Sequence, residues 1–530
     1  MKVLVTDKIN DIAKQILKEG EGIEVDLLPT MSEDELCEKI KEYDALMVRS
    51  QTKVTKKIFE AAQNLKIVGR AGVGVDNIDL DAATKKGVIV VNSPDGNTNA
   101  AAEHTLALML SMSRNIPAAV KSTKEGLWER SKFTGVEVFG KTLGVIGIGK
   151  IGTHVAQVAL ALGMRVVVCD PYTTKEAVEA LGCEYIDSYD KFWGQCDYIT
   201  VHVPKNKETT HMINKDTIAK MKKGVKLINC ARGGVMDEAA LKDALANGQV
   251  SAVALDVYET EPDVKASPLF GAEGNIVMTP HLGASTSEAQ LNVAIDVANQ
   301  IKAVLTGGSA SSAVNIPSLK PSKLEPVKDY MQLAENIGGI AMQILGANLS
   351  EIEITAKGSL ANVDVSPLET AILKGVFASF TDNVNFVNAP ILAKEKGINV
   401  TISKSATSGD FIGSISVKLT STNGNSAIVK GAMIAEGVQR VVQINNYVTS
   451  IEPQENMLLI PHENKPSMIA KVATVIGEAG ININDMHVVQ KQNDDSLMII
   501  NTNTEVNEEV LSKINSIDGV KTSKYISLIA

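Results

Sequence analysis

The glycine pattern Gly147-Ile-Gly149-Lys-Ile-Gly152 constrains the fold of this chain more than any other feature of its sequence. It follows an apolar run, residues 142–146, of strand length, and it leads into a segment with helical spacing. In that context the first glycine allows a tight turn, the second lets the backbone approach a pyrophosphate, and the third lets the helix pack against the strand. The pattern therefore predicts the first βα unit of a dinucleotide-binding domain, although the glycine spacing alone also occurs in ordinary turns.

A carboxylate at the end of the next predicted strand indicates which dinucleotide is bound. Asp170 directly follows the apolar run 165–169. A carboxylate in that place accepts hydrogen bonds from the adenosine ribose hydroxyls and repels a 2′-phosphate. Residues 171–174 include no arginine that would favour the phosphate. The sequence predicts NAD rather than NADP, and the alternative is that Asp170 only caps its strand.

Three further motifs place polar side chains directly after predicted strands of the same series. They are Asn-Cys-Ala-Arg232-Gly-Gly, Asp256-Val-Tyr-Glu-Thr-Glu261-Pro and Thr-Pro-His281-Leu-Gly. The carboxyl ends of parallel strands form the ligand crevice of an open α/β sheet. We therefore expect Arg232, Glu261 and His281 to lie in one crevice.

These three residue types suit the oxidation of a secondary alcohol. A histidine titrates near neutrality, so His281 can take the hydroxyl proton while hydride leaves the carbon. Glu261 would orient the imidazole and stabilise its protonated form, and Arg232 would bind a substrate carboxylate through two parallel hydrogen bonds. Each residue also has a plain structural alternative: a surface ion pair for Arg232, a turn for Glu261 and a packed histidine for His281.

The order of predicted elements indicates two interleaved α/β domains in the first part of the chain. Strands alternate with helices from the N-terminus, and two long helical patterns, 98–113 and 287–305, flank the glycine-motif series. We predict a flavodoxin-like substrate-binding domain made of residues 1–97 and 288–316. A doubly wound, Rossmann-type NAD-binding domain of residues 98–287 would be inserted into it.

The rest of the chain is predicted to form two more domains. Three prolines in the segment 316–326 predict a linker. Residues 317–450 have weaker motifs and are assigned to an α+β intervening domain. Residues 451–530 follow the order strand, helix, strand, strand, helix, strand, which is typical of a ferredoxin-like domain.

Composition excludes several classes of partner. The formal net charge of −10 argues against nucleic acid, and it means that an anionic substrate must be held by a local cluster of arginines. The five cysteines show no C-x-x-C pair or metal-like spacing, which fits a reducing compartment and predicts no metal site. The N-terminus reads as a strand, and no apolar run approaches the length of a membrane span, so the cytoplasm is predicted.

Taken in order, G-x-G-x-x-G, C-A-R-G-G, D-V-Y-x-x-E-P and P-H-L-G-A-S-T resemble the motifs of the D-isomer-specific 2-hydroxyacid dehydrogenases. The resemblance is strong over residues 1–315 and implies that Arg232, Glu261 and His281 are catalytic. The cofactor contacts that it implies are Val73, Gly147, Gly149, Lys150, Ile151, Gly152, Asp170, Val203, Cys230, Ala231, Arg232, Asp256, His281, Gly283 and Ala284, with Asp256 near the nicotinamide amide. The substrate contacts that it implies are Arg49, Arg70, Gly74, Asn97, Arg232 and His281, with Arg49 and Arg70 on a phosphate.

Within this family the chain is similar to long members that oxidise 3-phospho-D-glycerate to 3-phosphooxypyruvate with NAD, the first step of L-serine biosynthesis. The resemblance also implies a homo-oligomer, a tetramer. The terminal domain resembles an ACT regulatory domain, in which His462, Asn464 and Asn482 would contact serine between two such domains. Ser467 replaces the usual glycine, which would make the loop less able to close on a ligand. An ACT domain used for assembly alone is the alternative.

Two other functions are compatible with the same motifs. The first is a dehydrogenase for another 2-hydroxy acid, such as glycerate, hydroxypyruvate or 2-hydroxyglutarate, because such enzymes share the three catalytic residues. The second is a non-catalytic, NAD-sensing scaffold. An intact Arg232, Glu261 and His281 argue against the scaffold, since a binding protein has no need of a base.

Overall fold

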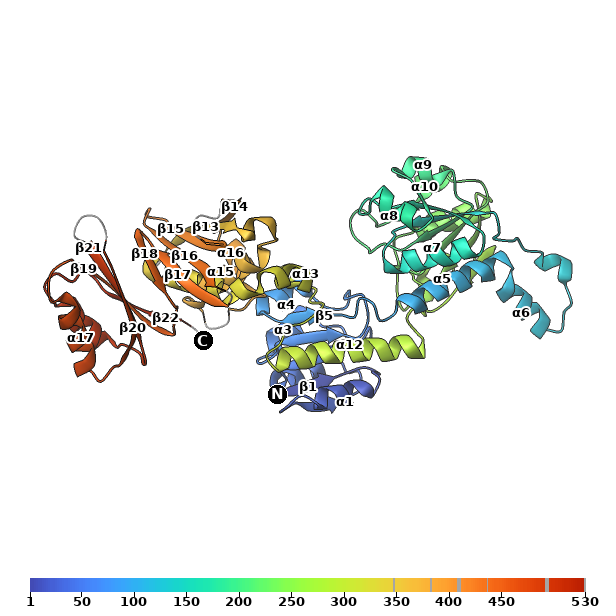
Figure 1. Cartoon of the computed structure of the whole chain (residues 1–530). Coiled ribbons are helices and arrows are strands. Elements are labelled where there is room, and N and C mark those ends of the chain that lie inside the picture. Colours follow the sequence, from blue (N-terminus) through green and yellow to red (C-terminus); the bar gives the residue numbers. More distant parts are fainter. Residues whose placement is uncertain (347, 382–383, 408–410, 436, 491–494, 529–530) are drawn as a thin grey trace.

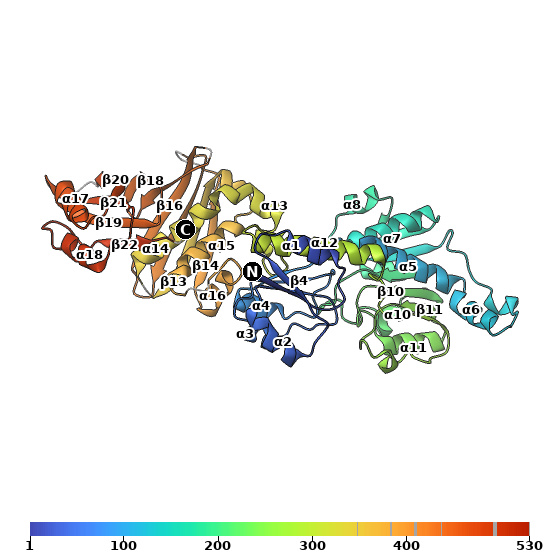
Figure 2. The ribbon, with the colours of Figure 1, turned by 90° about the horizontal axis from the view of Figure 1, so that it is seen from below.

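The computed structural model describes residues 1–346, 348–381, 384–407, 411–435, 437–490 and 495–528. Its domains lie one after another along an elongated molecule (Figure 1). The domain with the glycine motif is at one end, the domain with the N-terminus lies next to it, and the C-terminal sheet is at the other end (Figure 2). The last two residues assigned to the terminal domain, 529–530, lie outside the described residues.

The first domain is built on a five-stranded parallel sheet in the order β2-β1-β3-β4-β5. Apolar, β-branched runs form the strands and amphipathic segments form the helices, as the sequence pattern predicts. The elements are β1 (Lys2–Val5), α1 (Ile12–Lys18), β2 (Glu24–Leu27), α2 (Glu33–Lys39), η1 (Ile40–Glu42), β3 (Ala45–Val48), α3 (Lys56–Ala61), β4 (Ile67–Arg70), α4 (Leu80–Lys86) and β5 (Ile89–Val91).

The second domain has a seven-stranded parallel sheet in the order β12-β11-β10-β9-β6-β7-β8. The strand order reverses between β6 and β9, which creates the switch point where such sheets bind ligands. The elements are β6 (Thr142–Ile146), α7 (Lys150–Ala161), β7 (Arg165–Cys169), α8 (Lys175–Ala180), β8 (Glu184–Tyr185), α9 (Tyr189–Trp193), β9 (Tyr198–Val201), α10 (Lys215–Ala219), β10 (Val225–Asn229), α11 (Glu238–Ala246), β11 (Val250–Leu255), η3 (Val264–Ala266) and β12 (Asn275–Met278).

Two long helices connect these domains, α5 (Thr98–Ser113) and α12 (Ser287–Leu305). After α5 the chain forms α6 (Ile116–Lys124) and η2 (Arg130–Phe133), which extend away from the sheet (Figure 1). Helix α12 packs into the core of the first domain, where Val297 and Ile301 are fully buried. The chain then pairs Ala313 with Val91, so it returns to the edge of the first sheet.

The proline-rich connection consists of short helical turns rather than extended chain. They are η4 (Pro317–Leu319), α13 (Pro321–Leu324) and η5 (Glu325–Tyr330). Proline is tolerated in the first turn of a helix, because its missing N–H has no partner there. Val327 and Tyr330 are buried in the core of the third domain, so the linker ends as part of that core.

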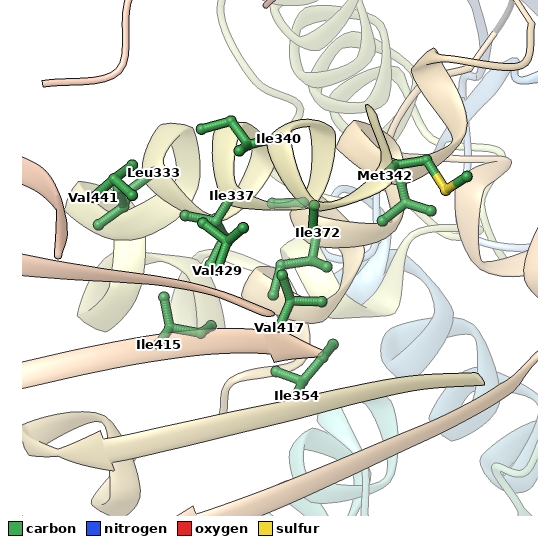
Figure 3. Close-up of a cluster of buried hydrophobic side chains, with 14 of the residues drawn as sticks. Leu333, Ile337, Ile340, Met342, Ile354, Ile372, Ile415, Val417, Val429 and Val441 are labelled. Carbon is green, nitrogen blue, oxygen red and sulfur yellow. The ribbon is translucent and has the colours of Figure 1, made fainter. Parts of the chain in front are cut away.

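The third domain has a six-stranded sheet in the order β14-β13-β15-β16-β17-β18. Helices α14 (Met331–Leu345) and α15 (Ser366–Ala378) contribute to its core, in which Ile337 of α14 and Ile372 of α15 lie over strand residues such as Val417 (Figure 3). The remaining elements are β13 (Leu349–Gly358), η6 (Ser359–Asn362), α16 (Ala389–Glu395), β14 (Asn399–Ser405), β15 (Gly413–Ser421), β16 (Ser426–Ala435), β17 (Val438–Ile444) and β18 (Tyr447–Ile451).

The fourth domain is a four-stranded antiparallel sheet in the order β20-β21-β19-β22, with a core shared by two helices. This arrangement confirms the predicted ferredoxin-like order. The elements are β19 (Asn456–Glu463), α17 (Met468–Glu478), β20 (Ile483–Gln490), β21 (Asp495–Thr502), α18 (Glu508–Asn515) and β22 (Lys524–Ser527).

Two negative findings hold for the part of the chain that the structure describes. None of its helices is both long enough and apolar enough to span a membrane. Its His, Cys, Asp and Glu side chains form no group of three that would hold a metal ion.

Candidate active site

The glycine loop has the geometry that a bound pyrophosphate needs. A Cβ atom added to Gly152 would lie 2.1 Å from the carbonyl oxygen of Gly147, so only glycine fits between the helix and the turn. Helix α7 starts at Lys150, and no side chain caps its first N–H groups. These N–H groups, with the positive end of the helix dipole, form an anion site.

Asp170 at the end of β7 is fixed beside this loop. One oxygen of its carboxylate accepts the N–H of Ile148 at 2.8 Å, and the other accepts the N–H of Tyr172 at 2.8 Å. Each oxygen retains a lone pair for a further donor. The residue thus lies where a ribose diol would reach it, and the local chemistry fits NAD.

Two more predicted cofactor contacts, Val203 and Lys150, lie at the glycine loop. Val203 follows β9, and its side chain lies against Gly147, since a Cβ added to this glycine would be 2.9 Å from Cγ1 of Val203. Lys150 forms an ion pair with Asp95, which belongs to the segment between the two domains. Both ionic side chains are largely exposed, so this pair adds little to stability.

His281 and Glu261 form the central pair of the site. Nδ1 of His281 lies 2.7 Å from Oε2 of Glu261, and the N–H of Tyr258 donates to the other carboxylate oxygen at 2.9 Å. The hydrogen bond with Glu261 raises the pKa of His281 above its ordinary value. Burial alone would raise the pKa of Glu261, but its hydrogen bonds hold it below its ordinary value. The pair therefore joins an ionised carboxylate to an imidazole whose protonated form is stabilised.

Arg232 is held by the short loop after β10. The amide of Asn229 fixes this loop by accepting the N–H of Ala231 and donating to the carbonyl of Arg232, each at 2.9 Å. A Cβ added to Gly233 would lie 1.6 Å from the carbonyl oxygen of Tyr258, so this glycine lets the loops after β10 and β11 touch. The guanidinium of Arg232 reaches the first domain, where its Nε donates to Asp76 at 3.3 Å.

Arg70 is a shielded cation, and the charges of Asp76 and Asp7 offset only part of the effects that lower its pKa. Its Nε is buried and has no hydrogen-bond partner among the described residues. Burial, and then the nearby charge of Arg232, lowers the pKa of Arg70 to about 10. Arg49 contributes in the same direction, which places three guanidinium groups near one another. Such a cluster supplies the local positive charge that the acidic composition requires.

Three further predicted contacts, Val73, Gly74 and Asn97, lie between β4, which ends at Arg70, and α5. A Cβ on Gly74 would lie 2.2 Å from a guanidinium nitrogen of Arg232, so Gly74 lets the arginine approach. The side-chain amide of Asn92 donates to the carbonyl of Val73, the residue before Gly74, and so fixes this part of the loop. Asn97 precedes α5 as its N-cap residue, and its side-chain oxygen is buried with no partner among the described residues.

The structure also identifies one residue that sequence reasoning missed, Asp7, and it adds a positioning role for Asp256, which was predicted as a cofactor contact. Asp7 at the end of β1 holds the substrate-side loop, because its Oδ2 accepts the N–H of Arg49 at 2.8 Å and that of Thr52 at 3.2 Å. Asp256 accepts the N–H of Leu282 at 2.7 Å and that of Gly283 at 2.8 Å, so it fixes the loop that carries His281. The only sequence signal for Asp7 is its place as a polar residue close after the first predicted strand.

Two of the predicted effector residues, His462 and Asn482, do not meet within one chain. His462 is opposite Ser496 near the start of β21, whereas Asn482 precedes Ile483, which is opposite Thr502 at the end of that strand. At about 3.3 Å per residue the two ends of β21 lie roughly 20 Å apart. His462 is buried and its Nε2 has no partner in the described part of the chain, while Asn464 and Asn482 are exposed.

Fold and site together define the class of this protein, an NAD-dependent dehydrogenase of the 2-hydroxyacid type. The model of the family described as "D-isomer specific 2-hydroxyacid dehydrogenase, NAD binding domain" matches residues 106–283. Two others match further along, "D-3-phosphoglycerate dehydrogenase intervening domain" at 326–445 and "ACT domain" at 457–519.

Full-length relatives narrow the class to one family. The chain is 43% identical to D-3-phosphoglycerate dehydrogenase of Synechocystis sp., over 99% of this chain and 95% of the relative. It is 42% identical to the enzyme of that name from Methanocaldococcus jannaschii, over the full length of both. The chain belongs to the D-3-phosphoglycerate dehydrogenase family.

A solved structure agrees with the cofactor assignment. D-lactate dehydrogenase from Aquifex aeolicus, solved with NAD and lactic acid, is 31% identical and covers 57% of this chain and 96% of its own, with a TM-score of 0.51. NAD is the cofactor, as the sequence predicts.

Proposed function

We propose that the protein oxidises 3-phospho-D-glycerate to 3-phosphooxypyruvate with NAD, the first step of L-serine biosynthesis. The observation that carries this proposal is Arg70, a shielded guanidinium whose Nε has no hydrogen-bond partner among the described residues. Arg70 lies near Arg232, whose charge also acts on His281. The names of the full-length relatives support the same substrate. A doubly anionic acid would place its phosphate at Arg70 and its carboxylate at Arg232.

Each residue of the site has a role in this reaction. His281 takes the proton of the 2-hydroxyl group on Nε2, because Nδ1 is engaged by Glu261. Glu261 then stabilises the resulting imidazolium, and Arg232 binds the carboxylate of the substrate. The nicotinamide, when bound, accepts the hydride from C2. The loops after β6 and β7 hold the rest of the cofactor, with Gly147, Gly149 and Gly152 at its pyrophosphate and Asp170 at its ribose.

Turnover assays with matched acids test the substrate. Purified protein should reduce NAD with 3-phosphoglycerate at a kcat/KM at least about tenfold higher than with glycerate or 2-hydroxyglutarate, because a phosphate contact by a shielded arginine is worth more than about 1.4 kcal/mol. A higher kcat/KM for an unphosphorylated acid would assign the protein to that acid. An absence of NADH formation with all of them would favour the NAD-sensing scaffold.

The pH dependence should report the pair of His281 and Glu261. Oxidation requires the unprotonated imidazole, and the pKa of His281 is raised. Activity should therefore be lost as the pH falls, with a midpoint above the ordinary histidine value of about 6.5. In Glu261→Gln the carboxylate is absent, so this midpoint should move to lower pH while kcat falls. A pH profile of kcat/KM in both proteins measures the shift; an unmoved midpoint would separate Glu261 from the titrating base.

We also propose that serine inhibits the enzyme through its ACT domains, in a site between two chains. His462 supports this, because its Nε2 is buried and unpartnered among the described residues. The separation of His462 from Asn482 requires the second chain. Ser467 adopts a left-handed backbone (φ +69°), so it reproduces the turn that glycine makes in the usual pattern.

Replacement of His462 by alanine tests the effector site. Serine should inhibit the wild-type enzyme, and His462→Ala should raise the serine concentration for half-inhibition by about tenfold or more, since a hydrogen bond to a charged ligand is worth about 1.5–3 kcal/mol. The uninhibited kcat should stay unchanged. If serine has no effect on the wild-type enzyme, the ACT domain serves assembly alone.

Finally, we propose that the protein is a homo-oligomer, a tetramer, in the cytoplasm. The arm around α6 exposes large apolar side chains, among them Val120, Leu127 and Trp128, of which Trp128 is 84% exposed. Exposed apolar patches of this kind mark interfaces. All five cysteines are free thiols, which fits a reducing compartment. Sedimentation should find four chains per particle, and a monomer would contradict the assembly.

A further inference from the structure

His104 connects the helix that enters the second domain with two loops of the active site. It lies in the middle of α5, and its Nε2 is 3.2 Å from Oδ1 of Asp256 and 3.1 Å from Oγ1 of Thr279. The hydroxyl of Thr279 donates to the same carboxylate oxygen at 2.6 Å. Nε2 must therefore carry its proton and donate to this carboxylate–hydroxyl pair.

Asp256 is the residue on which this network converges. It is fully buried, and its carboxylate receives donors from His104, Thr279 and two backbone N–H groups. The two backbone donors are Leu282 and Gly283, the residues directly after His281. The N–H of His281 itself donates to the Asp256 carbonyl at 2.9 Å. The position of Asp256 therefore sets the position of the His281 loop.

Among the donors to the Asp256 carboxylate that the structure records, His104 alone comes from outside the 279–283 loop. The same face of α5 makes other contacts with the site. A Cβ added to Gly283 would lie 4.0 Å from Ala101, and Thr105 is close enough to Cys230 to lower the pKa of its thiol, which burial raises. Helix α5 thus forms a platform under the loops after β10, β11 and β12.

Strand order indicates which part of the cofactor these loops meet. Asp170, the ribose acceptor, follows β7 on one side of the glycine loop, and β9, β10, β11 and β12 lie on the other side. A dinucleotide in this fold spans the switch point, with its two nucleosides over opposite halves of the sheet. The half that carries Asp256 and His281 is therefore the nicotinamide half.

We propose that His104 is a positioning residue for the nicotinamide end of the NAD site, and that it acts by holding the Asp256 carboxylate against the 279–283 loop. The inference rests on the proposed function for its kinetic consequences only. A side chain that served packing alone at this position would be apolar. The imidazole of His104 instead donates a hydrogen bond to a fully buried carboxylate, and such a specific contact fixes the position of both groups.

A pair of variants with a pair of ligands tests the proposal. His104→Leu has similar volume and a good helix propensity but lacks the donor, whereas His104→Gln can place an N–H near the Nε2 position. NAD and ADP-ribose, which has no nicotinamide, are titrated calorimetrically into each protein. His104→Leu should weaken NAD binding about tenfold, as expected for a lost charge-assisted hydrogen bond, and leave the ADP-ribose affinity unchanged. His104→Gln should restore most of the NAD affinity.

Several outcomes would overturn the proposal. One is an equal loss of affinity for NAD and ADP-ribose, which would mean a general structural role. Another is an unchanged NAD affinity in His104→Leu. The matched control is Glu103→Gln, an exposed neighbour on α5, which should leave both affinities unchanged. If His104→Leu does not fold, Thr279→Val removes the same network from its other side and should give the same discrimination between the two ligands.

A kinetic readout adds a second, independent measure. A poorly placed nicotinamide slows hydride transfer, so the primary deuterium isotope effect on kcat with C2-deuterated 3-phosphoglycerate should be larger in His104→Leu than in the wild-type enzyme. Partial unfolding would lower the active fraction without changing this ratio. If the wild-type enzyme does not oxidise 3-phosphoglycerate, the proposed function fails, while the binding comparison still decides the role of His104.

Discussion

Replacing His281 with alanine should lower kcat for the oxidation of 3-phosphoglycerate by a factor on the order of 10²–10⁴, with the affinity for NAD nearly unchanged. The reason is that His281 is the only base in the proposed reaction, since both carboxylate oxygens of Glu261 are already engaged, one by His281 at 2.7 Å and the other by the N–H of Tyr258. Steady-state kinetics and a separate NAD titration measure the two quantities. A wild-type kcat in the variant would refute the assignment of the base.

A second substitution at His281 is needed because of its backbone conformation. Its φ of +55° lies in the left-handed region, where alanine is strained and asparagine is tolerated. His281→Asn should therefore lose as much activity as His281→Ala with less loss of stability. His211 offers a matched control, because it also has a positive φ (+51°) and a glutamate partner, Glu259 at 3.2 Å. His211→Ala should keep kcat within about twofold, as it lies outside the proposed reaction path.

Replacing Arg70 with alanine should raise KM for 3-phosphoglycerate by about 10²-fold while kcat changes little. A shielded guanidinium bound to a phosphate contributes roughly 2–5 kcal/mol, and this contact is equal in the ground state and the transition state. KM for D-glycerate, which has no phosphate, should be nearly unaffected. If KM rises equally for both acids, Arg70 binds the carboxylate and the phosphate lies elsewhere.

The same substitution should not weaken the folded protein. Burial lowers the pKa of Arg70 to about 10, which means that the fold pays a free-energy penalty to keep this cation charged. Arg70→Ala removes that penalty, so the free energy of unfolding without substrate should stay the same or increase. Arg165→Ala is the control, since Arg165 is largely exposed and already paired with Glu184. It should change neither KM nor kcat.

Local patterns predicted the parts of the fold that depend on neighbouring residues. The run 142–146 is found as β6 (Thr142–Ile146), and the helical spacing of 98–113 and 287–305 is found as α5 and α12. The same logic brought Glu261 and His281 to one sheet edge, because the loops that carry them follow the neighbouring parallel strands β11 and β12. Glu261 and His281 are 20 residues apart in the sequence, and β12 lies between them.

Contacts between segments that are far apart in the sequence could not be predicted from local patterns. His104 and Asp256 are 152 residues apart, and His104 lies on a helix where its polarity gave no sign of a partner. The prolines at 316–326 predict a linker, and prolines also fit the first turns of helices, which the structure shows there. Nothing in the sequence pattern indicated that Val327 and Tyr330, directly after this segment, are buried in the third domain. The third domain was assigned only by its length and position, because its sequence motifs are weak, although three of its strand pairs are hairpins of consecutive strands.

The insertion of one domain into another has a consequence for synthesis on the ribosome. The core of the first domain includes Val293, Val297 and Ile301 from α12, and its last strand is covered by Ala313. The first segment of the nascent chain therefore lacks part of its core until α12 emerges, whereas the glycine-motif domain has by then left the ribosome complete. Since domains fold as units, we expect the later segment to fold first, while the sheet face that α12 covers stays partly exposed in the N-terminal segment.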